Sequence, residues 1–382
     1  MNTDTHRIVL ILGNGFDLDL GLKTSFKDFW KSNYCPKDYP APLIWYMNGC
    51  PKNSIEKFRW YDLENELYNY YQQRQDGAIE RDIITSAEQQ FLIHFDPNIT
   101  ARGHYPKYAN EIASLIEKGL VLVDTGFKAY MDIPYLQDLR KDASSRDKEA
   151  LIRINNGLRN YLKGLDYSQT IQAAVTDESR PPMSVAVLQL VIEAAKRGCI
   201  PDIFIFNYTN LLSYFPDHQI MGGWLHHIHG NCDGENIIIG TRDDVNIGKD
   251  YDFLYKSFAP GFKSHAIVSA LRDAKEIIIY GHSLGENDQQ YFKDFFAQQT
   301  SYGDTVSKNI TIFTKDNQSV LEIKRALQKM TNNRLSSLYA LNNLRIIKTT
   351  WNLSEEESVE LESFFDGFKT EYLHKRYSFD II

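Results

Sequence analysis

The sequence predicts an α/β fold, a Rossmann-like sheet of parallel strands with helices on both faces. One observation is a series of short apolar runs rich in Ile and Val, each too uniformly apolar for a strand with one solvated face. A second is that helical spacing follows several of these runs, as in chains that alternate strands and helices. The expected strands are residues 7–13, 202–207, 236–240, 276–281, 309–314 and 344–349.

The first expected strand runs directly into a glycine turn, Gly13-Asn14-Gly15, which is followed by a helix-like pattern. A glycine lets a ligand approach the backbone, and the amides that open a helix attract an anion. The segment GNGFD lacks the third glycine of G-x-G-x-x-G, and no G-K-[ST] follows it. Taken alone, such a turn is more often an ordinary tight turn than a ligand site.

Polar residues also follow the other expected strands. In a doubly wound sheet, ligands bind at the carboxyl ends of the strands, so these residues are candidates for a shared site. Asn207 can donate and accept at once and could hold a hydroxyl and a water, although a turn or capping role is the simpler explanation. The polar strand ends are residues 207–209 (NYT), 240–242 (GTR) and 281–283 (GHS).

Three histidines, His226, His227 and His229, fall within four positions and are followed by Gly230. Imidazole titrates near neutral pH and suits proton transfer, and the glycine would let a ligand come close. On a strand, His227 and His229 would face one side and His226 the other. Metal binding ranks below acid–base chemistry, because no carboxylate or cysteine stands at a familiar ligand spacing.

The segment GHSLG, residues 281–285, matches the G-x-S-x-G pattern of a serine hydrolase between an expected strand and an expected helix. That chemistry needs a histidine after Ser283 in the chain, and only His374 follows it. The hydrolase interpretation leaves GNGFD and FNYTN without a role. The alternative is that Gly281, Ser283 and Asp288 bind the ribose and phosphate groups of a nucleotide.

Composition narrows the class of protein. The 382 residues contain 42 Lys and Arg against 50 Asp and Glu, a net charge of −8, with no dense basic segment, so nucleic-acid binding is disfavoured. The four cysteines form no CxxC pair, which argues against structural zinc and fits a reduced cytoplasm. No secretion signal and no stretch of ~18 apolar residues is found, so we expect a cytoplasmic protein without a membrane association.

Between the first strand and residue 202, helical spacing dominates. Leu151, Ile154, Leu158, Leu162 and Leu165 fall on one helical face. We therefore expect residues 1–54 and 200–382 to form the α/β core and residues 55–199 a large helical insertion. Near the end of the chain, Ser354 and Glu357 have the spacing of a capping box that opens the last helix.

The motifs together resemble a known family. GNGFDLDLGLKTSF, WYDLENEL at residues 60–67, FNYTN, HIHGN with IIIG, and GHSLGENDQQYF are similar to the bacteriophage abortive infection AbiH family, in the same order and over about residues 7–295. The set also resembles, more distantly, the sirtuin-like fold. In those enzymes a glycine turn, a strand-end Asn, a His-Gly pair and a Gly-x-Ser strand end surround NAD.

The sirtuin-like resemblance implies roles for particular residues, with NAD as the substrate. Asn207 would order the ribose or a water, His229 would be the general base, Gly13 and Gly15 would back the pyrophosphate, and Gly281 with Ser283 would face the adenosine. Asn14 stands where a small residue is expected, and the deacylases' zinc-binding cysteines are missing, so neither a metal nor deacylation is expected. Further nucleotide-binding candidates are Asn14, Phe16, Asp17, Tyr208, Thr209, His227, Gly230, His282 and Asp288.

The expected function is therefore an anti-phage abortive-infection protein that binds NAD or a related nucleotide and hydrolyses NAD at its nicotinamide glycosidic bond. A phage or host protein would serve as the trigger, and a homo-oligomer is compatible with the sequence. Two alternatives stay open: a serine hydrolase that uses Ser283, and a nucleotide-binding sensor without catalysis.

Overall fold

The protein is described by a computed structural model, in which the chain divides into two compact units. The first unit comprises Met1–Ser25, Leu162–Ile237 and Gly261–Ile382, and the second comprises Phe26–Tyr161 and Ile238–Pro260. The structure describes residues 7–39, 41–48, 62–75, 133–176, 182–215, 225–234, 236–262, 267–303, 305–350 and 353–373.

The first unit is built on a six-stranded sheet in which every strand pair is parallel. The strand order is β3-β2-β1-β4-β5-β6, so the chain adds strands on one side of β1 and then on the other. This is a doubly wound, Rossmann-like order, which reverses between β1 and β4, and it confirms the predicted fold class. The strands are β1 (Arg7–Leu12), β2 (Ile200–Ile205), β3 (Leu225–His227), β4 (Glu276–Tyr280), β5 (Asn309–Thr314) and β6 (Asn343–Lys348).

One expected strand is wrong. Residues 236–240 are not part of the sheet, and Ile237 makes only an isolated bridge with Gly230. The third strand is instead β3, which pairs with Ile203 to Ile205 of β2. The apolar run is nevertheless explained by burial, because the side chains of Ile237, Ile238 and Ile239 are buried without pairing in a strand. The other expected runs do form strands.

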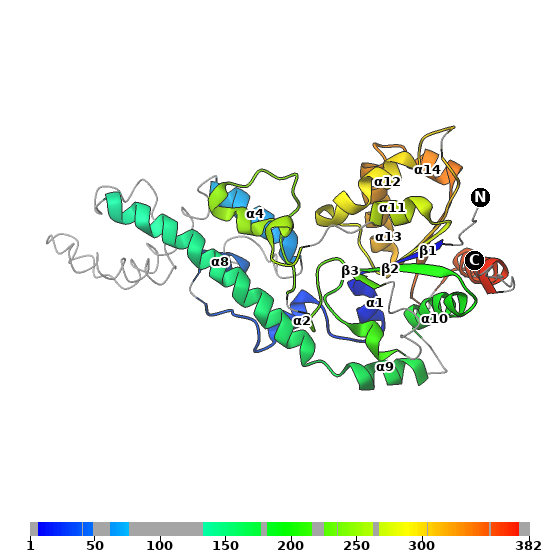
Figure 1. Cartoon of the computed structure of the whole chain (residues 1–382), viewed down its shortest axis with the longest axis horizontal. Helices are drawn as coiled ribbons and strands as arrows, with labels where there is room; N and C mark the ends of the chain where they lie inside the picture. Colours follow the sequence, from blue (N-terminus) through cyan, green and yellow to red (C-terminus); the bar gives the residue numbers. More distant parts are fainter. Residues whose placement is uncertain are drawn as a thin grey trace, which may run out of the picture. The chain divides into compact units, whose positions relative to one another are not determined.

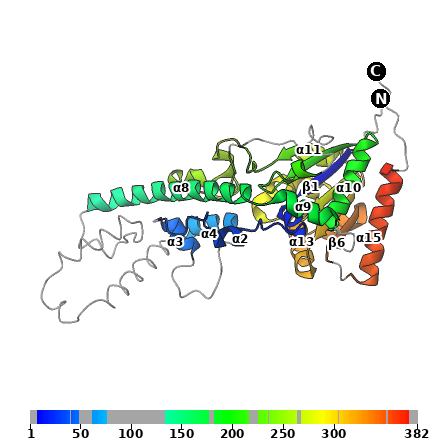
Figure 2. The ribbon, with the colours of Figure 1, turned by 90° about the horizontal axis from the view of Figure 1, so that it is seen from below.

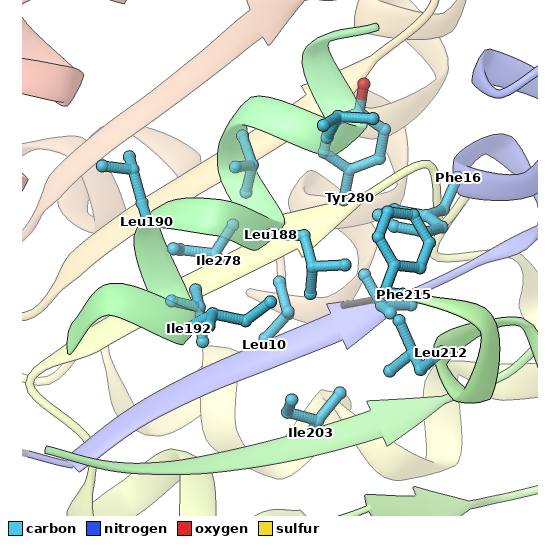
Figure 3. Close-up of a cluster of buried hydrophobic side chains, with 14 of the residues drawn as sticks. Leu10, Phe16, Leu188, Leu190, Ile192, Ile203, Leu212, Phe215, Ile278 and Tyr280 are labelled. Carbon is cyan, nitrogen blue, oxygen red and sulfur yellow. The ribbon is translucent and has the colours of Figure 1, made fainter. Parts of the chain in front are cut away.

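Helices cover both faces of the sheet (Figure 1). Side chains alternate along β1, so that Leu10 packs with α10 (Met183–Lys196), while Ile11 packs on the other face with α11 (Ile267–Asp273) and α13 (Asn317–Met330). Figure 3 shows the first of these cores, where Leu188 and Phe215 lie near Leu10. Both faces are apolar, which explains the uniformly apolar strands.

The remaining helices of this unit are short, apart from the last. Ser354 caps α15, since its Oγ accepts from the amide of Glu357 while its own amide donates to the Glu357 carboxylate at 2.7 Å. This confirms the predicted capping box. The elements are α1 (Asn14–Asp19), α9 (Tyr167–Thr176), α12 (Lys293–Gln298), α14 (Leu335–Leu341), α15 (Glu355–Phe368), the 3₁₀ turns η3 (Leu211–Tyr214) and η7 (Glu286–Tyr291), and the π turn η8 (Lys369–Leu373).

The second unit is helical and is organised around buried polar groups. The carboxylate of Asp147 accepts hydrogen bonds from the amide of Leu43 and from the hydroxyls of Tyr70 and Tyr251. Figure 2 shows α8 beside α3 and α4. The elements are α2 (Phe26–Lys31), α3 (Pro42–Met47), α4 (Leu63–Gln75), α8 (Ile133–Lys163), which ends within the first unit, η5 (Lys249–Leu254) and η6 (Lys256–Phe258).

The unit boundaries differ from the boundaries expected at residues 54/55 and 199/200. Helices α9 and α10 lie with the sheet, and residues 238–260 lie with the helices. The reason is visible in α10, where Leu188 and Val191 are fully buried in the core of the sheet unit. No helix in the described part of the chain is both long enough and apolar enough to cross a membrane.

Candidate functional site

The glycine turn after β1 packs against the loop after β4. The Gly13 amide donates to the carbonyl of Tyr280 and the Gly15 amide to the carbonyl of Gly281, both at 2.9 Å. A Cβ at Gly15 would lie 2.6 Å from the Gly281 Cα, and one at Gly13 would lie 2.5 Å from the His282 Cα. The glycines are therefore needed for this backbone contact. Both amides are thus engaged within the protein, and the role of the two glycines in backing a pyrophosphate stays a prediction.

Asp17 connects the turn to the end of β2. Its side chain is fully buried, and its carboxylate accepts from Asn207 Nδ2 at 2.5 Å and from Thr209 Oγ1 at 2.8 Å. The amide group of Asn207 is therefore held in one orientation, with nitrogen toward Asp17. Asn207 Oδ1 is buried and accepts no hydrogen bond from the described residues. A buried acceptor without a donor costs about 1–3 kcal/mol, so it marks a place where a ligand or water could donate.

Burial raises the pKa of Asp17 from 3.8 to about 7, against the opposing effect of the hydrogen bonds from Thr209 and Asn207. Desolvation disfavours the charged carboxylate more than these two donors stabilise it. A carboxyl that titrates near neutral pH beside a strand end is a common property of functional sites. The sequence identified Asp17 only as a ligand contact, whereas its side chain holds Asn207.

His229 lies just beyond β3 and is 2% exposed. Its ring centroid is 5.4 Å from that of Phe206 and 6.4 Å from that of Tyr208, the two neighbours of Asn207 in the chain. Its Nε2 is 3.0 Å from Oδ1 of Asp288, and His282 Nε2 is 3.3 Å from Oδ2 of the same carboxylate. The structure thus brings the predicted base and the predicted Asn to one edge of the sheet.

The structure separates His229 from the two histidines before it. His226 stacks on Phe204 with ring centroids 4.9 Å apart and lies 4.0 Å from Asp202, and its side chain is more than one-third exposed. His227 is the half-buried last residue of β3. Because the strand ends at His227, alternation along a strand does not apply to His229. Among the three, His229 is the one that contacts Asp288.

Two other predicted contacts, Phe16 and Gly230, have structural explanations. Phe16 is fully buried, and its ring packs against Phe215 and Tyr280. Gly230 has φ +70, and a Cβ there would lie 2.1 Å from the Asn236 carbonyl oxygen. These residues build the site's framework, and their direct role in binding stays a prediction.

A cavity of about 680 Å³ lies within the first unit at the ends of β1, β4, β5 and β6. This volume is in the range of ~300–1,000 Å³ typical of small-molecule sites. Asn207 and His229 are not among its lining residues; they follow β2 and β3, which lie on the other side of β1 from β4, β5 and β6 in the strand order. The lining consists of Asn14, Gly15, Leu18, Asp19, Tyr280, Gly281, His282, Ser283, Phe313, Thr314, Lys315, Ser319, Glu322, Ile323, Thr349 and Thr350.

Several residues that line this cavity, among them Asp19, Lys315 and Thr349, were not predicted from the sequence as site residues. Asp19 accepts from the Tyr280 hydroxyl at 2.7 Å and from the Ser184 amide at 2.9 Å, which fixes one wall. Burial and the neighbouring Asp19 raise the pKa of Tyr280 well above its usual range. Lys315 directly follows the expected strand 309–314, and Thr349 is the last residue of the expected strand 344–349 and directly follows β6. The rule that ligands bind at strand ends could therefore have identified them.

Ser283 does not have the geometry of a hydrolase nucleophile. In a nucleophile elbow, the serine itself occupies the strained turn between strand and helix. Here the residues of this segment with positive φ are Gly281, at 63°, and Leu284, at 52°, rather than Ser283, and a 3₁₀ turn follows. No hydrogen bond joins Ser283 to a histidine in the described residues, and His374 lies outside them. Among the described residues, no group of three or more His, Cys, Asp or Glu is arranged to hold a metal ion.

Comparison with known proteins places the chain in a family. Neither the curated proteins nor the solved structures give a match. The family model described as "Bacteriophage abortive infection AbiH" matches residues 9–308. The match covers the glycine turn, Asn207, the histidines and Asp288, as well as more than half of the chain. This protein therefore belongs to the bacteriophage abortive infection AbiH family.

Proposed function

We propose that this AbiH protein acts in abortive infection by binding NAD and hydrolysing its nicotinamide glycosidic bond. The observation that carries the proposal is that His229 lies near Phe206 and Tyr208, the chain neighbours of Asn207, while Asn207 bonds to Asp17 after β1 and His229 contacts Asp288 after β4, the two strands between which the strand order reverses. In doubly wound sheets, dinucleotides bind across that point, at the carboxyl ends of the strands. We further propose that NAD is bound at these strand ends in the same way as in sirtuin-like enzymes.

Asn207 would position the ribose or the attacking water. Asp17 holds Nδ2, so the buried Oδ1 is the atom that Asn207 offers to a donor. A ribose hydroxyl and a water can both donate to an amide oxygen. The acceptor would also stabilise the positive charge that develops on the ribose in an oxocarbenium-like transition state.

His229 would be the general base. Because Asp288 contacts Nε2, proton uptake by this ring takes place at Nδ1. In the reaction, the bond between ribose C1′ and the nicotinamide nitrogen breaks, and its electron pair leaves with nicotinamide. The water oxygen bonds to C1′ and its proton passes to His229, which later releases it to solvent. The products are nicotinamide, ADP-ribose and one proton.

The cavity would take the adenosine half of the dinucleotide. It begins at Gly281 and Ser283, on the opposite side of β1 from Asn207, and it is large enough for a base and a ribose. Its wall offers hydroxyls and carboxylates, including Thr349 and Glu322, that can accept from or donate to a ribose diol. The pyrophosphate would then cross the glycine contact between the two sides.

The proposal is tested by incubating the purified protein with NAD, alone and with phage lysate as a trigger, and measuring nicotinamide and ADP-ribose by mass spectrometry. We expect Asn207→Ala and His229→Ala each to lower the rate by on the order of 10²–10⁴-fold, the usual contribution of a positioned base. Val359→Ala, at an exposed position of α15, is the matched control and should keep the rate of the unmodified protein.

Two results would contradict the proposal. If Asn207→Ala or His229→Ala still consumed NAD at the unmodified rate, the catalytic assignment would be lost. If calorimetry detected NAD binding but no trigger produced turnover, the protein would be a nucleotide sensor rather than a hydrolase.

A further inference from the structure

One carboxylate, that of Asp288, is shared by two buried histidines from different parts of the chain. Oδ1 lies 3.0 Å from Nε2 of His229, and Oδ2 lies 3.3 Å from Nε2 of His282. The two histidine side chains are 2% and 4% exposed, and that of Asp288 is 16% exposed. Asp288 belongs to η7, which begins only a few residues after β4, so its position is set by the loop that also carries His282.

The backbone of this loop fixes which nitrogen of His282 carries the proton. The Leu284 amide donates to Nδ1 of His282 at 3.0 Å, so Nδ1 is an acceptor and the hydrogen of the neutral ring is on Nε2. That hydrogen points at Asp288. Leu284 reaches this position through a left-handed backbone with φ of 52°, a strained conformation for a residue other than glycine. Both ring nitrogens of His282 are therefore engaged within the protein.

This arrangement determines what each group can do. His282 cannot serve as a base toward a ligand, because Nδ1 already accepts from Leu284. It can hold one oxygen of Asp288, so that the other oxygen faces His229. Aromatic rings surround the three groups: Phe206 lies 4.4 Å from the ring of His282, and Tyr291 lies 6.0 Å from that of His229. Such surroundings strengthen hydrogen bonds to a charged carboxylate.

We propose that Asp288, oriented by His282, is the positioning residue that holds His229 as the Nε2–H tautomer and stabilises the ring when it takes a proton at Nδ1. This inference rests on the proposed function for the role of His229 as a base. The sequence predicted Asp288 and His282 as nucleotide contacts. In this proposal they do not touch the nucleotide but hold His229 in position. A carboxylate behind a catalytic histidine fixes its tautomer and stabilises the imidazolium without becoming protonated.

Asp288→Asn is the sharpest test, because it changes the hydrogen-bonding pattern at nearly constant shape. The new amide has one acceptor, and His282 must still donate because Leu284 fixes its Nδ1. The NH₂ group of the new side chain would then face His229 and force its Nε2 to accept. We therefore expect His229 to change to the Nδ1–H tautomer, while His282 stays unchanged.

The tautomers are read from long-range ¹H–¹⁵N correlation spectra of histidine-labelled protein at about pH 8, where an ordinary imidazole is neutral. His229→Gln and His282→Gln identify the two signals among the 10 histidines. Glu286→Gln is the matched control: it removes a carboxylate from the same 3₁₀ turn, where Glu286 pairs with Lys329 at the surface. We expect it to change neither tautomer.

Several outcomes decide the matter. In the unmodified protein, both rings should be Nε2–H, and an Nδ1–H signal from either would overturn the proposal without any variant. An unchanged His229 tautomer in Asp288→Asn would overturn it as well. On the kinetic side, Asp288→Asn should lower kcat by on the order of 10²-fold or more with KM within about twofold. A raised KM with unchanged kcat would instead make Asp288 a substrate contact.

The spectra need no NAD, so the two failures can be told apart. If the unmodified protein does not hydrolyse NAD but shows the expected tautomers, the proposed function fails while the arrangement of Asp288, His229 and His282 stands. If NAD is hydrolysed but the tautomers differ, only the role of Asp288 is lost.

Discussion

Asp17 shows how a single residue couples the site to pH. Its pKa is about 7 in the folded protein, against an ordinary value of 3.8. Between about pH 4 and 7 the folded state therefore keeps a proton that the unfolded chain has released. The free energy of unfolding falls as pH rises through this window, by on the order of a few kcal/mol. Above pH 7 the carboxyl is ionised in both states, and the free energy of unfolding falls no further on its account.

We expect Asp17→Asn to flatten this pH dependence, measured as the denaturation midpoint in urea from pH 4 to 8. Glu276→Gln is a matched control, because burial raises the pKa of Glu276 to about 7 as well, although this residue begins β4 at the opposite end of the sheet from the site. Both substitutions should flatten the profile, but only Asp17→Asn should lower NAD hydrolysis. An unaltered slope in Asp17→Asn would show that the Asp17 pKa is ordinary.

At the scale of elements, the glycines of the turn after β1 allow this turn to pack against the backbone of the loop after β4. In Gly15→Ala the new Cβ would lie 2.6 Å and 2.8 Å from the Cα and carbonyl oxygen of Gly281. Backbone atoms cannot rotate away, so we expect a loss of about 1–3 kcal/mol of stability or more, measured by chemical denaturation. Gly367→Ala is the control: it lies inside α15 with nothing within 4 Å of its Cβ, and should stabilise by about 0.5–1 kcal/mol. Equal effects would contradict this account.

The elements also show where local patterns mislead. The apolar run 236–240 looks like a buried strand, but it does not join the sheet: Ile237 makes an isolated antiparallel bridge with Gly230, and the run forms a buried connection instead. The three residues of β3 pair with β2 although their sequence, LHH, has no apolar run. Pairing depends on which edge is available, and that is a property of the whole sheet. The capping box at Ser354 was predictable because both partners lie within one helical turn.

At the scale of the whole molecule, each unit has its own buried polar contacts. In the second unit, Asp147 joins α8 to α3, α4 and η5 through Leu43, Tyr70 and Tyr251. We expect Asp147→Ala to leave these three donors unsatisfied and to cost on the order of 3 kcal/mol. Hydrogen exchange should accelerate around these residues while the amides of the sheet stay protected. Unchanged exchange in α4 and η5 would contradict a central role for Asp147.

The sequence by itself determined the α/β class, most of the strands, the AbiH family, the polar strand end that contains Asn207 and the histidine cluster that contains His229. These follow from patterns within a few residues: apolar runs, glycine turns and the order of motifs. Only the tertiary structure decided that Asp17, 190 positions from Asn207, orients its amide, that His229 rather than His226 contacts Asp288, and that the cavity reaches Thr349. The physical reason is that orientation, burial and proton placement arise from contacts between distant strand ends, and a local pattern does not contain them.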